Sequence, residues 1–341
     1  MGGRNHSWQR LSDERLLDVR MCDLDLEIEG SWLEESIERL HGELDRRDLR
    51  VRPHCWLSNE WFCPEDIPGI AIPFYLAHPR LRRLERKQML EVEGGTRDHC
   101  MKLLRHEAGH AIEHAFRLDR RPTFRKVFGD PKRPYPEYYR PNPASQRYVH
   151  NLHLWYAQSH PYEDFAETFA VWLAPKSQWR KRYACWPARK KLEYVDELMT
   201  ELAGERPRVN SRRRVDPLPT LKQTLRDYYA EKHARYSPGY SDDYDRELTS
   251  LFVNGSPPVD EGRPAATFLR RNRREIRRRV SRWTGEYELT LDVVLEDMIG
   301  RCRQLKLRAV GPEEELKLNF AILLTAKTMH YVYRNREWHA L

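Results

Sequence analysis

The sequence has no long hydrophobic run and no closely spaced pair of cysteines. Its most apolar stretches, 69–77 and 318–326, are shorter than the roughly 20 residues that span a bilayer, which argues against a membrane protein. Residues 1–6 contain no apolar segment of the kind that directs secretion, so we expect a cytoplasmic protein. The cysteines form no C-x-x-C pair, which argues against a zinc ribbon and a disulfide scaffold. They are Cys22, Cys55, Cys63, Cys100, Cys185 and Cys302.

The composition is that of a folded, soluble protein. The chain has 341 residues, of which 10 are Trp, 17 are Tyr and 10 are Phe, enough aromatic surface for a packed core. A formal net charge of +8 could favour acidic partners, although a soluble surface of this size can also carry it. The length suggests two domains, or one large domain with an appendage. A basic, proline-containing stretch after Pro207 predicts their boundary, giving domains 1–206 and 207–341.

The pattern of apolar residues predicts a mixed α+β first domain and a mostly helical second one. Three helices are expected in the first domain, from Ser31 to about 48, from 97 to 118 and from 162 to 173. Ser31 and Glu34 form a capping pair at the start of the first helix, and Thr96 precedes the second. Strands are expected at 49–58, 68–77 and 89–93. A proline inside the second strand, Pro73, favours an edge position, and Ile70–Ala77 is a candidate for pairing with an extended substrate.

The central helix carries His106-Glu107-Ala108-Gly109-His110. Histidines four residues apart lie on the same helix face, about 5–6 Å apart at Cβ, and can share one tetrahedral zinc ion. Glu107 can take a proton from water at that ion, as in H-E-x-x-H peptidases. The alternative is a charged helix face without a metal. Apolar neighbours around the motif favour the metal site, because burying two histidines and a glutamate without partners is costly.

A catalytic zinc ion usually takes three protein ligands. His114 continues the histidine stripe, but a straight helix places it about 12 Å from His106. The metzincin pattern fails because Glu113 and Phe116 stand where glycine and histidine are required. The remaining candidates are Glu163 and Glu167, which share one face of the next helix. One would bind metal and the other could orient a ligand histidine, unless both merely form an acidic first turn.

At this point the sequence resembles the gluzincin peptidases, and more closely a bacterial family known as putative zinc-binding metallopeptidases. The resemblance covers roughly residues 95–175. It rests on Arg105–His110, Phe128-Gly129-Asp130, Tyr156-Ala157, Ser159-His160-Pro161 and Glu163–Thr168.

The resemblance implies a zincin-like catalytic domain, with a small sheet and an active-site helix, that hydrolyses peptide or protein substrates with one Zn²⁺ ion. It implies His106, His110 and Glu163 as metal ligands, with Glu167 buttressing a ligand histidine and Glu107 as general base. Asp164 competes with Glu163 for the third position. Tyr156 and His160 are candidates for stabilising the transition state, and the alternatives are a packing residue and a turn into the helix. The N-terminal cysteine-rich ribbon of some relatives is missing from this sequence.

The second domain contains an arginine-rich segment, 268–283. Eight arginines lie there against one acid, Glu275, from Arg270 to Arg282. Leu269, Ile276, Val280 and Trp283 fall on one helix face, which predicts docking along that stripe. The arginines are either a solvated face or a site for nonspecific nucleic acid or an acidic partner. The alternative function is therefore a nonenzymatic or regulatory zinc protein that binds such a partner. The sequence does not indicate an oligomeric state.

Overall fold

The computed structural model describes residues 7–136, 139, 141–142, 144–153, 155–236, 244–253 and 262–335. Within them the chain divides into two compact units, one formed mainly by residues 7–228 and the other mainly by residues 229–335. Helices dominate both units and each unit has a two-stranded sheet, which agrees with the expected α+β class. No helix of the described residues is long and apolar enough to cross a bilayer.

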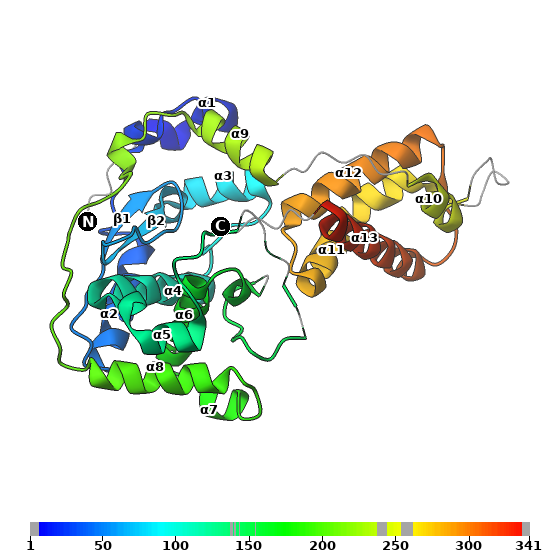
Figure 1. The fold of residues 1–341 in the computed structure, drawn as a ribbon. Coiled ribbons are helices and arrows are strands. Elements are labelled where there is room, and N and C mark those ends of the chain that lie inside the picture. Colours follow the sequence, from blue (N-terminus) through cyan, green and yellow to red (C-terminus); the bar gives the residue numbers. More distant parts are fainter. Residues whose placement is uncertain are drawn as a thin grey trace. The chain divides into compact units, whose positions relative to one another are not determined.

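The first unit is a stack of a small sheet and helical layers (Figure 1). The sheet packs on one side of α4 (Arg97–Phe116), α6 (Pro161–Leu173) packs on α4, and α8 (Arg189–Glu201) packs on α6. The other helices of this unit are α1 (Asp13–Leu17), α2 (Trp32–Asp45), α3 (Pro79–Met89), α5 (Pro122–Phe128), α7 (Trp179–Arg182) and the first part of α9 (Leu225–Tyr236). The central position of α4 and α6 explains why nearly all their side chains are buried.

The predicted helix starts rest on the side chains that the sequence indicated. Thr96 caps α4 by accepting from the backbone N–H of His99, and Ser31 accepts from that of Leu33 at the start of α2. The carboxylate of Glu34 reaches back to the N–H of Gly30. Helix α4 ends two residues earlier than expected, because Arg117 takes the left-handed conformation with φ 55°.

The sheet is smaller than the sequence predicted. Strands β1 (His54–Ser58) and β2 (Gly69–Pro73) pair in parallel, and His54 faces Gly69. The expected second strand ends at Pro73, and Phe74–Ala77 forms a 3-10 turn. The expected strand at 89–93 is wrong, since Met89 is the last residue of α3, which the sequence analysis missed. At the edge of β2 expected to pair with substrate, the N–H of Ala71 already donates to the carbonyl of Phe62.

The segment that follows residue 206 packs within the first unit. The carbonyls of Arg213, Val215 and Asp216 accept hydrogen bonds from side chains of β1, namely His54, Trp56 and Ser58. The backbone N–H of Met21 donates to Gln223. The first unit therefore extends past the expected boundary to Tyr228.

The second unit is built on three long helices, α11 (Ala265–Thr284), α12 (Glu288–Gln304) and α13 (Glu313–Asn335). A short helix, α10 (Asp245–Leu251), and the strand pair β3 (Arg263–Pro264) and β4 (Arg308–Ala309) complete it. Its core includes Phe252, Phe268 and Phe320. Leu269, Ile276 and Val280 of α11 face this core as predicted, whereas Trp283 is 83% exposed. Thr284 is buried in that last turn instead.

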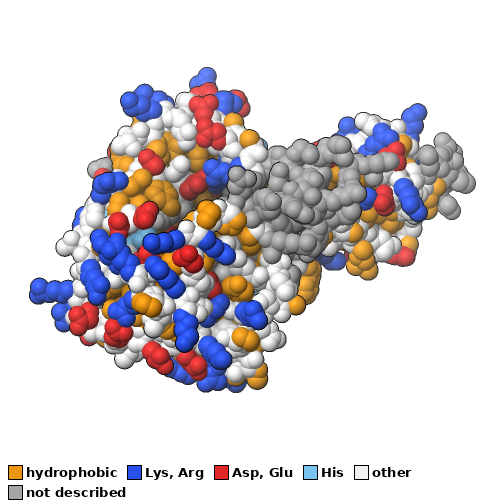
Figure 2. Space-filling model, viewed as in Figure 1, with side chains coloured by type: hydrophobic (Ala, Val, Ile, Leu, Met, Phe, Trp, Pro, Cys, Tyr) orange, Lys and Arg blue, Asp and Glu red, His pale blue; other side chains and the backbone are white. Residues whose placement is uncertain are grey.

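The arginines of α11 are largely engaged by acids of their own unit. Arg273 pairs with Asp292 and Glu296 of α12, and Arg277 pairs with Asp292 and Glu288. Arg279 pairs with Glu275 along α11 itself. Positive and negative side chains are interspersed on the visible surface (Figure 2).

Candidate metal centre

Helix α4 places His106 and His110 one turn apart on its α6-facing side. Their Nε2 atoms lie 3.2 Å apart, and their rings meet edge to face. The side chain of His106 is almost completely buried, while that of His110 is 12% exposed. The two imidazoles therefore converge on one point, and His110 is the more accessible of the two to solvent.

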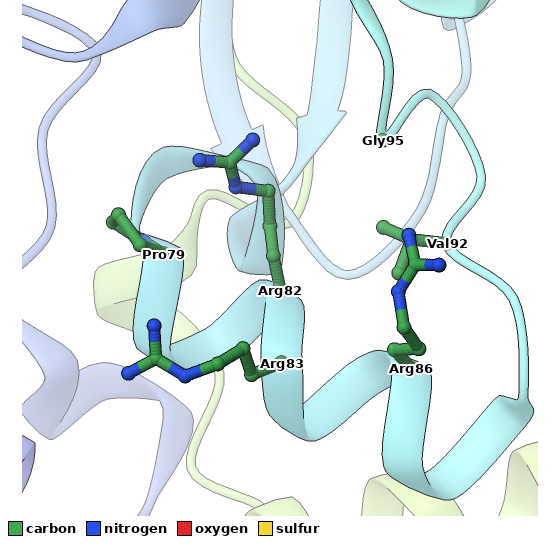
Figure 3. A pocket seen from close by; sticks show the side chains of 6 residues that line it. All are labelled: Pro79, Arg82, Arg83, Arg86, Val92 and Gly95. Atoms are coloured by element: carbon green, nitrogen blue, oxygen red, sulfur yellow. The ribbon is translucent and has the colours of Figure 1, made fainter.

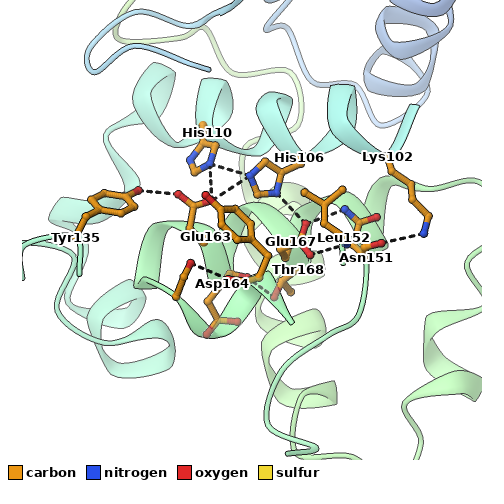
Figure 4. Close-up of polar contacts among 12 residues, drawn as sticks. Lys102, His106, His110, Tyr135, Asn151, Leu152, Glu163, Asp164, Glu167 and Thr168 are labelled. Atoms are coloured by element: carbon orange, nitrogen blue, oxygen red, sulfur yellow. Dashed lines mark hydrogen bonds and ion pairs between the residues drawn. The ribbon is translucent and has the colours of Figure 1, made fainter. Parts of the chain in front are cut away.

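Helix α6 supplies the third converging atom (Figure 4). Oε2 of Glu163 lies 3.0 Å from Nε2 of His106 and 3.2 Å from Nε2 of His110. A tetrahedral ion with bonds of about 2.0–2.1 Å holds its ligand atoms roughly 3.3–3.4 Å apart. The observed triangle is close to that size. It is the one group of His, Cys, Asp and Glu side chains among the described residues whose geometry could hold a metal ion.

A glycine allows the two helices to come this close. A Cβ built on Gly109 would lie 2.8 Å from Cα of Ala166 and 3.2 Å from its carbonyl oxygen. Both neighbours are backbone atoms, which cannot turn away as a side chain can. Gly109 and Ala166 therefore set the distance between the helix that carries the histidines and the helix that carries the glutamates.

Glu167 fixes the orientation of His106. Its Oε1 accepts hydrogen bonds of 2.8 Å from Nδ1 of His106 and from Nδ2 of Asn151, and its Oε2 accepts one of 2.8 Å from the N–H of Leu152. With its proton on Nδ1, His106 turns the lone pair of Nε2 toward the Glu163 carboxylate. Two lone pairs 3.0 Å apart repel unless a cation or a proton lies between them. The donor set thus fits a metal ion.

The local charges shift the pKa values of these groups in opposite directions. Burial alone would lower the pKa of His106, but hydrogen bonds to Glu163 and Glu167 raise it well above its usual value. Burial alone would raise the pKa of Glu163, but His110 and His106 hold it well below its usual range. The pKa of His110 is also raised, since Glu163 outweighs the effect of burial. The Glu163 carboxylate therefore stays ionised and favours a positive charge in the space between it and the two histidines.

Glu107 lies beside this triangle, close to His106 and His110. Its side chain is 6% exposed and makes no hydrogen bond or ion pair to any part of the chain that the structure describes. Burial raises its pKa, and the nearby His106 and His110 partly offset that effect. A buried carboxylate with a raised pKa and no partner is able to accept a proton.

The structure separates the other two candidate ligands from the triangle. Asp164 points to α8, where its Oδ2 lies 2.6 Å from Nζ of Lys191, and burial raises its pKa to about 7. His114 pairs with Glu113 through a 3.0 Å contact. Neither side chain joins the metal-binding group.

Tyr156 and His160 differ in how they relate to the site. The Tyr156 ring lies 5.6 Å from the His106 ring, centre to centre, and burial raises its pKa well above the usual value. Both ring nitrogens of His160 are used by the backbone. Nδ1 accepts from the N–H of Tyr162, and Nε2 donates to the carbonyl of Arg133. His160 is therefore the cap of α6 as well as a neighbour of the site.

Tyr135 is a site residue that the sequence analysis missed. Its hydroxyl donates a 2.8 Å hydrogen bond to Oε1 of Glu163, the carboxylate oxygen that does not face the histidines. Its ring stacks on His160 at 3.9 Å between centres, yet 47% of the residue is exposed. It lies between Pro134 and Pro136 in a segment without periodicity, so no sequence pattern indicated its position.

Comparison with known proteins agrees with this geometry. The model of a family described as "putative zinc-binding metallo-peptidase" matches residues 70–184, which is 115 of the 341 residues. No curated protein and no solved structure matches the chain. The matched segment contains β2 except for Gly69, all of α4 and α6, and every side chain of the candidate metal centre. Over this segment, the chain is similar to the family of putative zinc-binding metallo-peptidases.

Proposed function

We propose that the first unit is a zinc-dependent peptidase of zincin-like, gluzincin type that holds one ion between His106, His110 and Glu163. The observation that carries the proposal is the buried Glu107 beside the triangle of ligand atoms, which has no hydrogen-bond or ion-pair partner among the described residues. A site that only stored zinc or stabilised the fold would have no use for this carboxylate. Its presence favours catalysis over a structural or regulatory metal.

In this proposal each side chain has a separate task. A bound zinc ion supplies a Lewis acid and lowers the pKa of a water molecule to about 7. Glu107 accepts the proton of that water and passes it to the leaving amine of the substrate. Tyr156, beside His106, donates a hydrogen bond to the developing oxyanion.

Two further residues keep the ligands in place. Glu167 holds His106 through Nδ1, and Tyr135 holds Glu163 through Oε1 so that only Oε2 faces the histidines. Since the ring nitrogens of His160 are engaged by the backbone, we assign it the support of Tyr135 by stacking in place of direct contact with substrate.

The arginines of α11 favour no second function. Arg273, Arg277 and Arg279 are engaged by acids of their own unit, which leaves fewer of them for the phosphates of a nucleic acid. A peptide or protein substrate of the first unit therefore remains the proposed partner.

Zinc content and hydrolysis measured on the same variants test this function. Glu107→Gln is expected to keep zinc and to lose cleavage of a mixed peptide library. Glu163→Gln is expected to lose both. His114→Gln is the matched control, because His114 lies on α4 one turn beyond His110 but outside the triangle. Full hydrolysis by Glu107→Gln, or a zinc-loaded wild type that cleaves no peptide, would rule out the peptidase.

A further inference from the structure

A small pocket with three arginines lies beside α3, in the part of the first unit that precedes α4 (Figure 3). Its volume is about 270 Å³, just below the roughly 300–1,000 Å³ of sites for drug-sized ligands. The pocket is lined by Pro79, Arg82, Arg83, Arg86, Val92 and Gly95. No acidic side chain is among them.

The three pocket arginines form no ion pair with an acid of the described residues. Elsewhere on α3, Arg80 and Lys87 both pair with Asp13. In contrast, Arg82, Arg83 and Arg86 make no ion pair with any residue that the structure describes. Three positive charges therefore line one small volume, and no described acid pairs with them.

Arg82 is the most enclosed of the three. Its Nε is buried and has no hydrogen-bond partner, and its guanidinium lies 5.2 Å from the centre of the Trp32 ring. Burial lowers the pKa of Arg82, and the nearby Arg83 and Arg86 lower it further. A buried donor without an acceptor costs free energy, and so does the mutual repulsion of like charges. A bound anion would relieve the mutual repulsion of the three guanidinium groups.

One residue of the pocket wall, Gly95, lies next to the start of a long helix. Gly95 immediately precedes Thr96, the N-cap of α4, so the pocket lies at the N-terminal end of a 20-residue helix. The partial positive charge at a helix N-terminus adds to the field of the arginines.

We propose that this pocket binds a small, doubly charged oxyanion, either inorganic phosphate or the phosphate group of a small monoester. Three guanidinium groups match a dianion better than a single carboxylate, and their planar donor pairs suit phosphate oxygens. The pocket is too small for a whole nucleotide to be enclosed. This site is separate from the metal centre and does not depend on the proposed peptidase function.

Calorimetric titration with phosphate at constant ionic strength tests the proposal on the full chain. The variant is Arg83→Gln/Arg86→Gln, which removes two exposed side chains, so folding is expected to be unaffected. The control is Lys87→Gln/Arg97→Gln, which removes two charges near the pocket that do not line it. Acetate is the singly charged comparison ligand, and methyl phosphate represents a monoester. Melting temperatures without ligand confirm that both variants fold.

We expect phosphate to bind the wild type and the control alike and to bind the pocket variant at least about tenfold more weakly. Methyl phosphate binding as well as phosphate indicates a site open to monoesters, and its exclusion indicates a site for free phosphate. The proposal is overturned if phosphate does not bind at millimolar concentration, or if acetate binds equally well. It is also overturned if the control loses as much affinity as the pocket variant.

Discussion

The contact between Gly109 and Ala166 makes a quantitative prediction for Gly109→Ala. The new Cβ would lie 2.8 Å from Cα of Ala166, whereas ordinary contacts begin at 3.4 Å, so the helices must separate by about 0.6 Å. Overpacking of this kind costs about 1–3 kcal/mol, and replacing a helical glycine returns about 1 kcal/mol. The free energy of unfolding should therefore fall only modestly.

Zinc affinity should respond much more strongly. The ligand triangle has sides of 3.0–3.2 Å, and metal–ligand distances tolerate only about 0.2 Å of error. A displacement of α6 by about 0.6 Å carries Glu163 out of that tolerance. We expect zinc affinity to fall by about 10–100-fold, the range seen when ligand orientation is lost.

Competition with a chromophoric chelator measures this effect directly. Gly42→Ala is the matched control, because Gly42 also lies in a helix of the first unit and its nearest neighbour is the flexible end of Arg46, 3.9 Å away. The control should keep wild-type zinc affinity and gain slightly in thermal stability. If Gly109→Ala binds zinc within about twofold of the control, the close approach of α4 and α6 does not set the site.

Two further predictions concern Tyr135 and Glu286. Tyr135→Phe removes the hydrogen bond to Glu163 but keeps the stacked ring, so we expect weaker zinc binding in the chelator assay, and unchanged affinity would refute its role. Burial without a partner for Oε1 raises the pKa of Glu286 to about 7 from the unfolded value of 4.5, so its ionisation destabilises the fold increasingly from pH 4.5 to 7. Glu286→Gln should match the wild type in urea denaturation at about pH 4 and exceed it by up to about 3 kcal/mol at about pH 8; equal stability at the higher pH would contradict this.

The parts of the site that lie on helices could be predicted from the sequence. His106 and His110 follow the helical repeat, and so do Glu163 and Glu167, so their spacing alone places each pair on one helix face. The distance between the two faces could not be predicted, because it depends on the contact of Gly109 with the backbone of Ala166, far away in the chain.

The features that the sequence did not predict have different physical causes. Helix α3 has only a few buried apolar side chains, Leu81, Leu84 and Met89, among many charges, and its pattern resembles a solvated loop. The segment after residue 206 is held to β1 through its own carbonyl groups, which any residue type possesses. The hydrogen bond from Tyr135 to Glu163 joins a loop to a helix and leaves no periodic trace.

Glu167 has a consequence for the order in which the protein folds and acquires its metal. Glu167 lies on α6, and its carboxylate accepts hydrogen bonds from His106 of α4 and from the segment 151–152. His106 therefore has its final orientation only when α4, α6 and this segment are packed together. In a zinc finger, metal binding drives an otherwise unfolded chain to fold. In this protein the orientation of His106 depends on the packing of α4, α6 and the segment 151–152, so an unfolded chain does not hold the finished site. In the proposed zinc peptidase, metal loading would thus follow the packing of the first unit, and zinc retained after purification would report on folded chains.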